Sequence, residues 1–255
     1  MNLIAVRTIQ MLTKWGFILL VVTLLALATP ALGLAEGTYP VFLPLILRAE
    51  PANTNPVHEG IATYYYATGA GACSFDPSPD DLMVAAMNAD EYDQAAYCGA
   101  YINVKGRKGS VVVRIVDLCP GCAAGHLDLS QEAFAQIDNL SAGRVPITWQ
   151  VVSPALNGPI AYHFKSGSNQ WWMAVQVRNH RNPIASLEYR AAGSSDWVPV
   201  TRASYNYFVQ SEPDPGPGPY DFRVTDWYGN VLTDNAIPLV AGGTIAGAAQ
   251  FPAGP

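Results

Sequence analysis

The feature that most constrains the fold is a series of short runs rich in β-branched and aromatic residues, separated by segments that contain glycine, proline or asparagine. The densest run, SVVVRIVDL at 110–118, has so many β-branched residues that we expect part of it to be buried on both faces. The chain contains 22 glycines and 20 prolines, and only 13% of its residues are charged, which indicates many turns and short strands. The pattern predicts an all-β protein.

The strand candidates form two groups, which predict two domains. A first domain is expected over 57–152, a linker with the composition SPALNGP over 153–159, and a second domain over 160–255. The strand candidates of the first domain are 61–66, 82–88, 101–104, 110–118 and 147–152. Those of the second are 160–165, 171–178, 185–191, 197–202, 220–226 and 231–233. The regular spacing of the second group, without a helical period, predicts a β-sandwich.

One helix is predicted in the first domain. Ser130 is a suitable N-cap, Glu132 lies in the first turn, and Phe134, Ile137 and Leu140 recur on one face. We therefore expect a helix that follows Ser130 and includes all three apolar residues.

The N-terminus has the pattern of a secretory signal peptide. Residues 1–35 contain Arg7 and Lys14 but no acidic residue, followed by a short apolar run and small residues. A retained membrane anchor is the alternative, but the apolar run is shorter than the roughly 20 residues that a span needs, and Pro30 ends it. We therefore expect cleavage, export to the extracellular space, no membrane association afterwards, and a tether over 36–56.

The charge of the chain disfavours one class of partner. The formal net charge is −6, and removing the two cations of the signal peptide makes it −8. A protein this acidic is a poor candidate for nucleic-acid binding.

The chain has four cysteines, Cys73, Cys98, Cys119 and Cys122, and an even number in an exported protein indicates disulfides. Three pairings are possible. The C-P-G-C spacing would suggest redox chemistry in a cytosolic protein, but no βαβ pattern surrounds it, and a four-cysteine zinc site fits poorly with export. We favour Cys73–Cys98 and Cys119–Cys122.

Two carboxylates are the first candidates for chemistry. Asp117 lies at the end of the densest strand candidate and would point out at a rim. Asp128, eleven residues later, lies just before the N-cap Ser130, where backbone N–H groups would favour its charge. Paired carboxylates are used in glycoside hydrolysis, but both side chains could equally be hydrogen-bonded to loop backbone.

These motifs resemble the expansin family. The segments HEGIATY at 58–64, GAC at 71–73, VD at 116–117 and LDLS at 127–130 look like the double-psi β-barrel domain of expansins, and the CPGC loop resembles the fungal loosenin-type members. The segment from Lys165 through Trp171 and Trp172 to His180 resembles the carbohydrate-binding domain of bacterial expansins. The resemblance covers about 58–252 and implies a six-stranded double-psi β-barrel followed by an immunoglobulin-like β-sandwich.

The resemblance also implies roles for residues of the barrel. Asp128 matches the general acid of the related family 45 endoglucanases, while the separate catalytic base of those enzymes is missing in expansins. Asp117 and Thr63 match polar groove residues important for wall loosening. Bacterial expansins have a sugar-stacking tyrosine where this chain has Cys119, and Tyr64, Tyr65 or Tyr66 would substitute for it; we choose Tyr65.

In the second domain, Trp171, Trp172 and Tyr205 match a flat aromatic platform that binds cellulose, and Lys165 matches a polar partner beside it. The apolar face of a glucose ring buries area by stacking on such aromatic faces. Adjacent residues of a simple strand point to opposite sides, so core packing of one tryptophan is the alternative.

The implied function is non-hydrolytic loosening of cell-wall polysaccharide by a secreted monomer that binds cellulose or another β-glucan. No cofactor or metal is expected, since His58, His163 and His180 show no ligand spacing, and His126 is interpreted as a loop residue rather than a base. One alternative is a peptidoglycan lytic transglycosylase of the rare-lipoprotein-A kind, which shares the VVVRI-x-D and DLS layout. An endoglucanase is a weaker version of that enzyme hypothesis, and a carbohydrate-binding module with an inert barrel is a third possibility.

Overall fold

The computed structural model describes residues 55–255. The predicted signal peptide (1–35) and nearly all of the predicted tether (36–56) lie outside this range. Among the described residues, no helix combines the length and the apolar character needed to cross a membrane.

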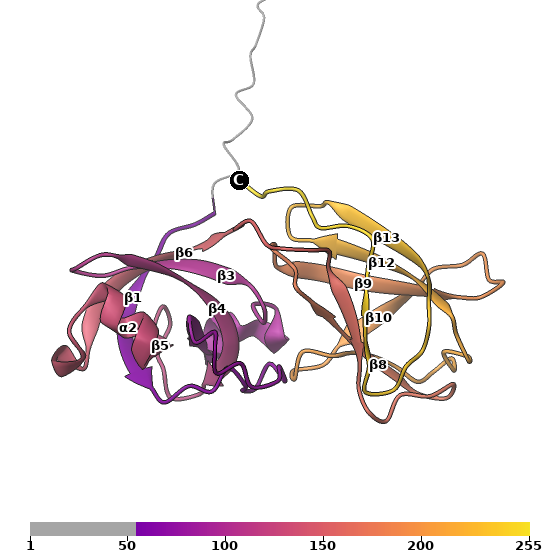
Figure 1. Ribbon diagram of the computed structural model, residues 1–255, viewed down its shortest axis with the longest axis horizontal. Coiled ribbons are helices and arrows are strands. Elements are labelled where there is room, and N and C mark those ends of the chain that lie inside the picture. Colours follow the sequence, from indigo (N-terminus) through magenta and orange to yellow (C-terminus); the bar gives the residue numbers. More distant parts are fainter. Residues whose placement is uncertain (1–54) are drawn as a thin grey trace, which may run out of the picture. The chain divides into compact units, whose positions relative to one another are not determined.

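The first six strands close into a barrel (Figure 1). Their order around the barrel is β1-β5-β2-β4-β3-β6. Two of the pairs, β1 with β5 and β2 with β4, are parallel, and the other neighbours are antiparallel. The strands are β1 (His58–Tyr65), β2 (Val84–Asn88), β3 (Tyr101–Lys105), β4 (Ser110–Cys119), β5 (Leu127–Ser130) and β6 (Val145–Val152). The predicted double-psi barrel is confirmed, although β5 was not recognised as a strand.

Helix α2 (Gln131–Ile137) begins where the sequence predicts but is shorter than expected. The Ser130 hydroxyl accepts a hydrogen bond from the Ala133 N–H at 3.1 Å, and Phe134 and Ile137 are buried against the barrel. Leu140 does not continue the apolar face, because Asp138 has an extended backbone and its carboxylate accepts from the next N–H. Leu140 starts a separate 3-10 turn, η2 (Leu140–Ala142), and is 38% exposed.

A second helical segment, α1 (Ala89–Tyr92) followed by η1 (Asp93–Ala95), was not predicted. It follows β2 directly, where the Asn88 side chain caps the helix by accepting from the Glu91 N–H. The segment lies within the loop closed by the Cys73–Cys98 disulfide.

The remaining strands form the predicted β-sandwich, in the order β13-β12-β9-β10-β11-β8-β7-β14. They are β7 (Ala161–Phe164), β8 (Met173–Arg178), β9 (Ile184–Ala191), β10 (Val198–Arg202), β11 (Phe208–Gln210), β12 (Tyr220–Asp226), β13 (Val231–Ile237) and β14 (Thr244–Ala246). Strand β10 joins the two layers, because its first half pairs with β9 and its second half with β11. The short strands β11 and β14 were not predicted.

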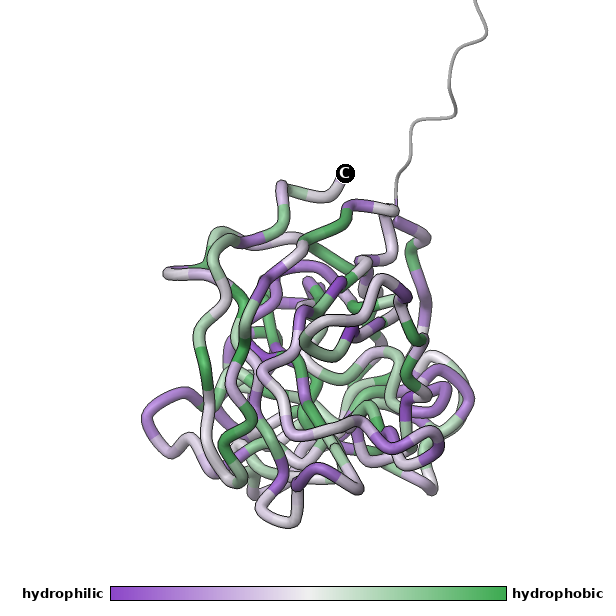
Figure 2. The backbone as a smooth tube through the Cα atoms, turned by 90° about the vertical axis from the view of Figure 1, so that its right-hand side faces the viewer, coloured by the Kyte–Doolittle hydropathy of each residue, from purple (hydrophilic) through white to green (hydrophobic). Residues whose placement is uncertain are grey.

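The core of the sandwich is aromatic. Hydrophobic and hydrophilic stretches alternate along the chain in Figure 2, and β12 alternates strictly between buried and half-buried residues. The rings of Tyr162 and Phe222 stack with centroids 4.8 Å apart, and the Tyr162 hydroxyl donates to Asp234 at 2.8 Å. Burial and the nearby carboxylate raise the pKa of Tyr162, so its hydroxyl stays protonated and keeps this bond.

Hydrogen bonds connect the two domains beyond the linker. The Cys73 carbonyl accepts from Gln176 Nε2 at 2.8 Å and from Asn206 Nδ2 at 3.2 Å, and both donors are buried. The Tyr92 hydroxyl donates to the Ser204 carbonyl at 3.0 Å. These bonds satisfy polar groups that the contact between the two domains buries.

Candidate functional site

Strand register places the polar groove residues in one row. Thr63 on β1 is paired with Asp128 on β5, Asp128 with Ala86 on β2, and Ala86 with Asp117 on β4. Neighbouring strands lie about 4.8 Å apart, so the two aspartates, two strands apart, have Cα atoms about 10 Å apart. The register therefore brings together three residues that the sequence selected from three separate segments.

A β-bulge places Asp117 in this row. The pairing of β2 with β4 passes from Ala85–Ile115 to Ala86–Asp117, which leaves Val116 as an extra residue. Ile115 and Val116 are consequently both buried, and Asp117 has the same partner in β2 as Asp128. The consecutive buried residues expected in this strand are therefore present. Asp117 does not lie at the end of the strand, because β4 continues to Cys119.

Backbone groups hold the Asp117 carboxylate. Its Oδ1 atom accepts from the N–H groups of Ala72, at 2.7 Å, and Leu118, at 2.8 Å. A Cβ atom on Gly71 would lie 2.3 Å from Asp117 Cγ, so only glycine allows this close approach. The second carboxylate oxygen remains available to accept from a ligand.

Asp128 is held by side chains rather than by the helix. It lies in β5, and its Oδ1 accepts from the Thr63 hydroxyl at 2.6 Å. His126 Nε2 lies 3.1 Å from the same hydroxyl oxygen. Within residues 55–255, Asp128 makes no hydrogen bond to a backbone N–H group of α2, which the Ser130 side chain caps. That the helix favours the charge of Asp128 stays a prediction.

The three consecutive tyrosines at the end of β1 have different environments. Tyr64 packs against Phe134 with ring centroids 5.0 Å apart, and Tyr66 is 86% exposed. Tyr65 follows Thr63 by two positions, so both point to the same side of the strand. Its hydroxyl is buried and has no hydrogen-bond partner, and burial together with Asp117 and Asp128 raises its pKa. The Tyr65 hydroxyl is therefore protonated and buried.

The aromatic residues of the predicted platform are exposed to different degrees. A turn precedes β8, in which Asn169 Oδ1 accepts from the N–H groups of Trp171 (2.8 Å) and Trp172 (3.2 Å). Trp171 is 62% exposed and Trp172 is half-buried, with its ring against Gly167. Because both tryptophans belong to the turn and not to the strand, the alternation of a strand does not bury one of them completely.

Tyr205 and Lys165, the other residues of the predicted platform, lie close to each other. Tyr205 is 38% exposed and lies beside Tyr207, with ring centroids 5.9 Å apart. Lys165 Nζ lies 5.8 Å from the centroid of Tyr205 and 5.0 Å from that of Tyr207. This geometry is that of a cation–π contact, which holds the lysine beside the aromatic faces.

A cleft of about 570 Å³ connects the surroundings of Asp117 with Tyr205. Its lining residues come from both domains: Gly71, Ala72, Ser74, Ala89, Tyr92, Gln94, Leu118, Ser204 and Tyr205. Three of them, at 71, 72 and 118, are the residues that contact Asp117. The volume is typical of ligand sites in proteins.

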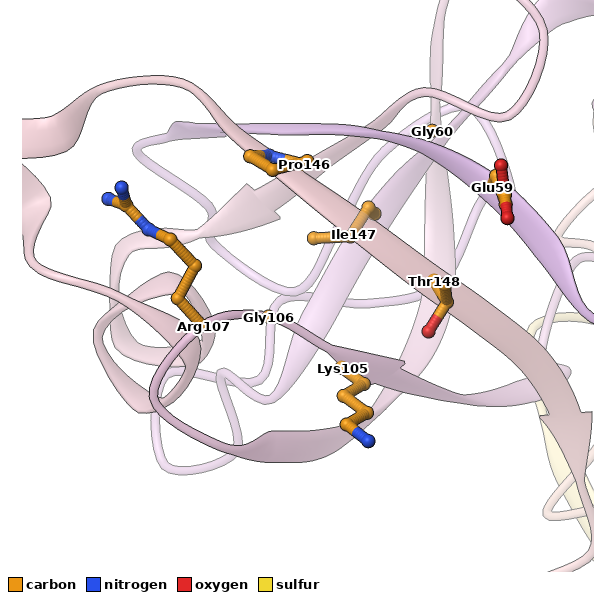
Figure 3. Close-up of a pocket in the computed structure, with 8 residues that line it drawn as sticks. All are labelled: Glu59, Gly60, Lys105, Gly106, Arg107, Pro146, Ile147 and Thr148. Atoms are coloured by element: carbon orange, nitrogen blue, oxygen red, sulfur yellow. The ribbon is translucent and has the colours of Figure 1, made fainter.

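A second cleft, of about 450 Å³, lies on the wall formed by β1, β6 and the β3–β4 turn (Figure 3). Its charged side chains are Glu59, Lys105 and Arg107. None of the predicted site residues lines it. We therefore place the candidate site at the carboxylate row and not in this cleft.

The segment before Asp128 is supported by residues that the sequence did not reveal. Glu91 accepts from the Gly125 N–H at 2.9 Å and contacts His58 Nδ1 at 3.1 Å. Trp149 Nε1 donates to the Gly125 carbonyl at 3.0 Å, and its ring stacks on that of His58 at 3.9 Å. Only the strand pairing of β1 with β6 brings His58 to Trp149, so no local signal would have identified this support.

Both favoured disulfides, Cys73–Cys98 and Cys119–Cys122, are present. The second closes the turn that directly follows Asp117 and Leu118. Within residues 55–255, no group of three or more histidine, cysteine, aspartate or glutamate side chains is arranged to hold a metal ion.

Comparison with known proteins relates the chain to one family. Residues 58–149 match the lytic transglycolase family with a double-psi β-barrel. Expansin-YoaJ of Bacillus subtilis is 38% identical over 209 residues, which covers 77% of this chain and 87% of that protein. Expansin-like protein 1 of Dictyostelium discoideum is 30% identical over 186 residues, 68% of this chain and 64% of that protein.

The structure of apo expansin from Clavibacter michiganensis is similar to this one, with a TM-score of 0.70 and 36% identity. The similarity covers 77% of this chain and 99% of that expansin. A mutant of the same expansin, solved in complex with cellohexaose, gives the same TM-score of 0.70. The relatives and the shared two-domain fold show that this chain belongs to the expansin family.

Proposed function

We propose that this protein is secreted, binds β-glucan of the cellulose type, and loosens cell-wall polysaccharide without cleaving it. The observation that carries the proposal is a cleft lined by residues of both domains, which extends from the residues in contact with Asp117 to Tyr205. An open surface of this kind suits an extended polymer. The cellohexaose complex of an expansin 36% identical to this chain supports cellulose as the polymer class.

The platform supplies affinity through stacking. Trp171 offers an exposed indole face and Tyr205 a phenol face, and the apolar faces of glucose rings lose contact with water when they stack on them. The row supplies directional contacts. Asp117 and Asp128 each retain acceptor capacity for sugar hydroxyls.

Loosening follows from competition for hydrogen bonds. A glucan chain held on the row exchanges its lateral hydrogen bonds to neighbouring chains for bonds to the two carboxylates. Each exchange is nearly neutral in free energy, so stacking on the platform provides the net driving force.

Cleavage would require more than the row provides. Hydrolysis of a glycosidic bond generally uses an acid and a second carboxylate that activates water or attacks. In the described part of the chain, the strand positions next to Thr63 carry no carboxylate other than Asp128. Asp117 lies two strands away and accepts two backbone N–H groups, an arrangement suited to binding.

The test compares the wild type with Asp128→Asn in a creep assay on cellulose strips, together with mass spectrometry of soluble products. Asp196→Asn, which changes an exposed aspartate in a sandwich loop, is the matched control. We expect Asp128→Asn to abolish creep, the control to retain it, and no protein to release soluble sugars. Cello-oligosaccharides that appear with the wild type and disappear with Asp128→Asn would make the protein an enzyme and end the proposal.

A second candidate function is lytic cleavage of peptidoglycan, which the family match over residues 58–149 favours. Incubation with purified peptidoglycan decides between the two functions. Anhydro-muropeptides that depend on Asp128 would establish the lytic activity. Binding to cellulose without any muropeptide release would support the expansin function. Unchanged creep in Asp128→Asn would mean that the barrel is inert and that the protein acts as a binding module only.

Export and a monomeric state are also part of the proposal. They rest on the signal-peptide pattern of residues 1–35 and on the absence of any feature in the sequence that requires a second copy. N-terminal sequencing of protein recovered from culture medium, followed by light scattering, tests both. A chain that retains residues 1–35 or elutes as a dimer would contradict this part.

A further inference from the structure

The Thr63 hydroxyl has two neighbours but only one proton. Its oxygen lies 2.6 Å from Asp128 Oδ1 and 3.1 Å from His126 Nε2. A hydroxyl donates one hydrogen bond, and an ionised carboxylate can only accept. The distance of 2.6 Å falls in the range of a charge-assisted O–H···O⁻ bond, so the proton of Thr63 belongs to the bond with Asp128.

This assignment determines the role of the histidine. With its proton directed to Asp128, Thr63 Oγ1 can only accept from His126, and the imidazole must therefore carry its proton on Nε2. We propose that His126 is a positioning residue whose Nε2–H donates to Thr63 Oγ1 and thereby directs the single proton of Thr63 to Asp128.

Hydrogen bonds fix the main chain of His126. Its backbone N–H donates to the Ala123 carbonyl at 3.0 Å, and its backbone carbonyl accepts from Asn88 Nδ2 at 3.1 Å. The residue is buried, with 8% of its surface exposed. Burial, and next the nearby Arg144, lowers the pKa of His126, which keeps the imidazole neutral near pH 7 and makes the choice of tautomer meaningful.

The inference changes the expected function of Thr63. Its proton and one lone pair are both used within the protein, so Thr63 is not the donor that reaches the polysaccharide. It orients Oδ1 of Asp128 and leaves Oδ2 to accept from a sugar hydroxyl. The effect on polysaccharide rests on the proposed function, whereas the tautomer of His126 is a property of the protein alone.

The tautomer is tested directly by nuclear magnetic resonance. Long-range ¹H–¹⁵N correlation spectra of the ¹⁵N-labelled protein near pH 7 distinguish a protonated from an unprotonated ring nitrogen, and the spectrum of His126→Gln identifies the resonances of this histidine by their loss. We expect a protonated Nε2 and an unprotonated Nδ1. The opposite tautomer would require Thr63 to donate to the histidine and would overturn the inference.

The functional consequence is tested with three substitutions in the creep assay. His126→Gln places an amide donor near the position of Nε2 and is expected to retain most of the activity, whereas His126→Leu removes the donor and is expected to lower the creep rate about fivefold. Thr63→Val is expected to produce a similar loss. Thermal unfolding of each variant shows whether the fold is retained.

Adding His126→Leu to Thr63→Val is expected to cause little further loss, because the histidine acts through the threonine. Full additivity of the two losses, or a His126→Gln variant as impaired as His126→Leu, would overturn the inference. A wild-type protein that produces no creep would contradict the proposed function, and the resonance experiment would still decide the tautomer.

Discussion

Acidification is expected to destabilise the protein through one buried histidine between the two domains. His180 is 3% exposed, and its Nδ1–H donates to the Asn182 carbonyl at 2.8 Å. Its Nε2 faces Gly99 of the barrel domain, where an added Cβ atom would lie 2.5 Å from the nitrogen. Burial, and next the charges of Arg202 and Arg114, lowers the pKa of His180 from 6.5 to about 4, although the bond to Asn182 opposes this shift.

The sign and size of the effect follow from proton linkage. Between pH 6.5 and pH 4 the unfolded chain binds a proton at this histidine and the folded chain does not, so stability falls as the pH falls through this window. The free energy of unfolding is expected to decrease by about 2 kcal/mol at pH 5 and by about 3 kcal/mol below pH 4, and to be unaffected by His180 above pH 7.

The perturbation that isolates this contribution is His180→Asn. The asparagine amide can still donate to the Asn182 carbonyl but does not titrate. Urea unfolding, followed by tryptophan fluorescence and circular dichroism with the disulfides intact, measures the stability of both proteins at pH 7 and pH 5. The variant is expected to be less stable at pH 7, because its side chain is smaller, but to lose about 2 kcal/mol less than the wild type on acidification.

The reasoning would be refuted if both proteins lost the same stability between pH 7 and pH 5. Equal losses would mean that His180 binds its proton equally well in the folded state. The other histidines with lowered pKa values, His126 and His163, are unchanged in the variant, so their contributions cancel in the comparison.

Three further variants test the predicted platform, the support of the site and the first disulfide. Trp171→Ala is expected to weaken binding to amorphous cellulose about tenfold in sedimentation assays with an unchanged unfolding midpoint, and unchanged binding would exclude Trp171 from the platform. Gly60→Ala places a Cβ atom 1.9 Å from the Gly125 carbonyl oxygen and is expected to cost about 3 kcal/mol or more in urea unfolding; a stable variant would show that the segment before Asp128 can move. Replacing Cys73 and Cys98 by alanine opens a loop with a sequence separation of 25 and is expected to cost about 3.5 kcal/mol, whereas a loss below about 1 kcal/mol would contradict the chain-entropy estimate.

Local sequence was sufficient for most of the strands. A run of β-branched residues identified β4, because a pleated strand favours these residue types. Both of its partners, β2 and β3, were also predicted as strands. Local sequence was insufficient for β5, where LDLS is short and contains an aspartate at its centre. The apolar spacing also predicted that α2 reaches Leu140, because such a pattern does not show where the backbone leaves the helical conformation.

The resemblance of sequence motifs to a family identified the candidate site residues. It did not predict how these residues are arranged in space. Thr63 and Asp128 are 65 positions apart, and nothing in the periodicity of either segment states that they form a pair. The sequence placed His126 in a loop without a role, because its contact with Thr63 exists only after β1 and β5 pair in parallel.

The sequence by itself determined the residue types, the order of the motifs and the alternation that separates core from surface. The tertiary structure decided the register across β1, β5, β2 and β4, and the bulge at Val116 that brings Asp117 into line with Asp128. The physical reason is that a one-residue change of register moves a side chain to the other face of a sheet, and the packing of distant strands selects between the two.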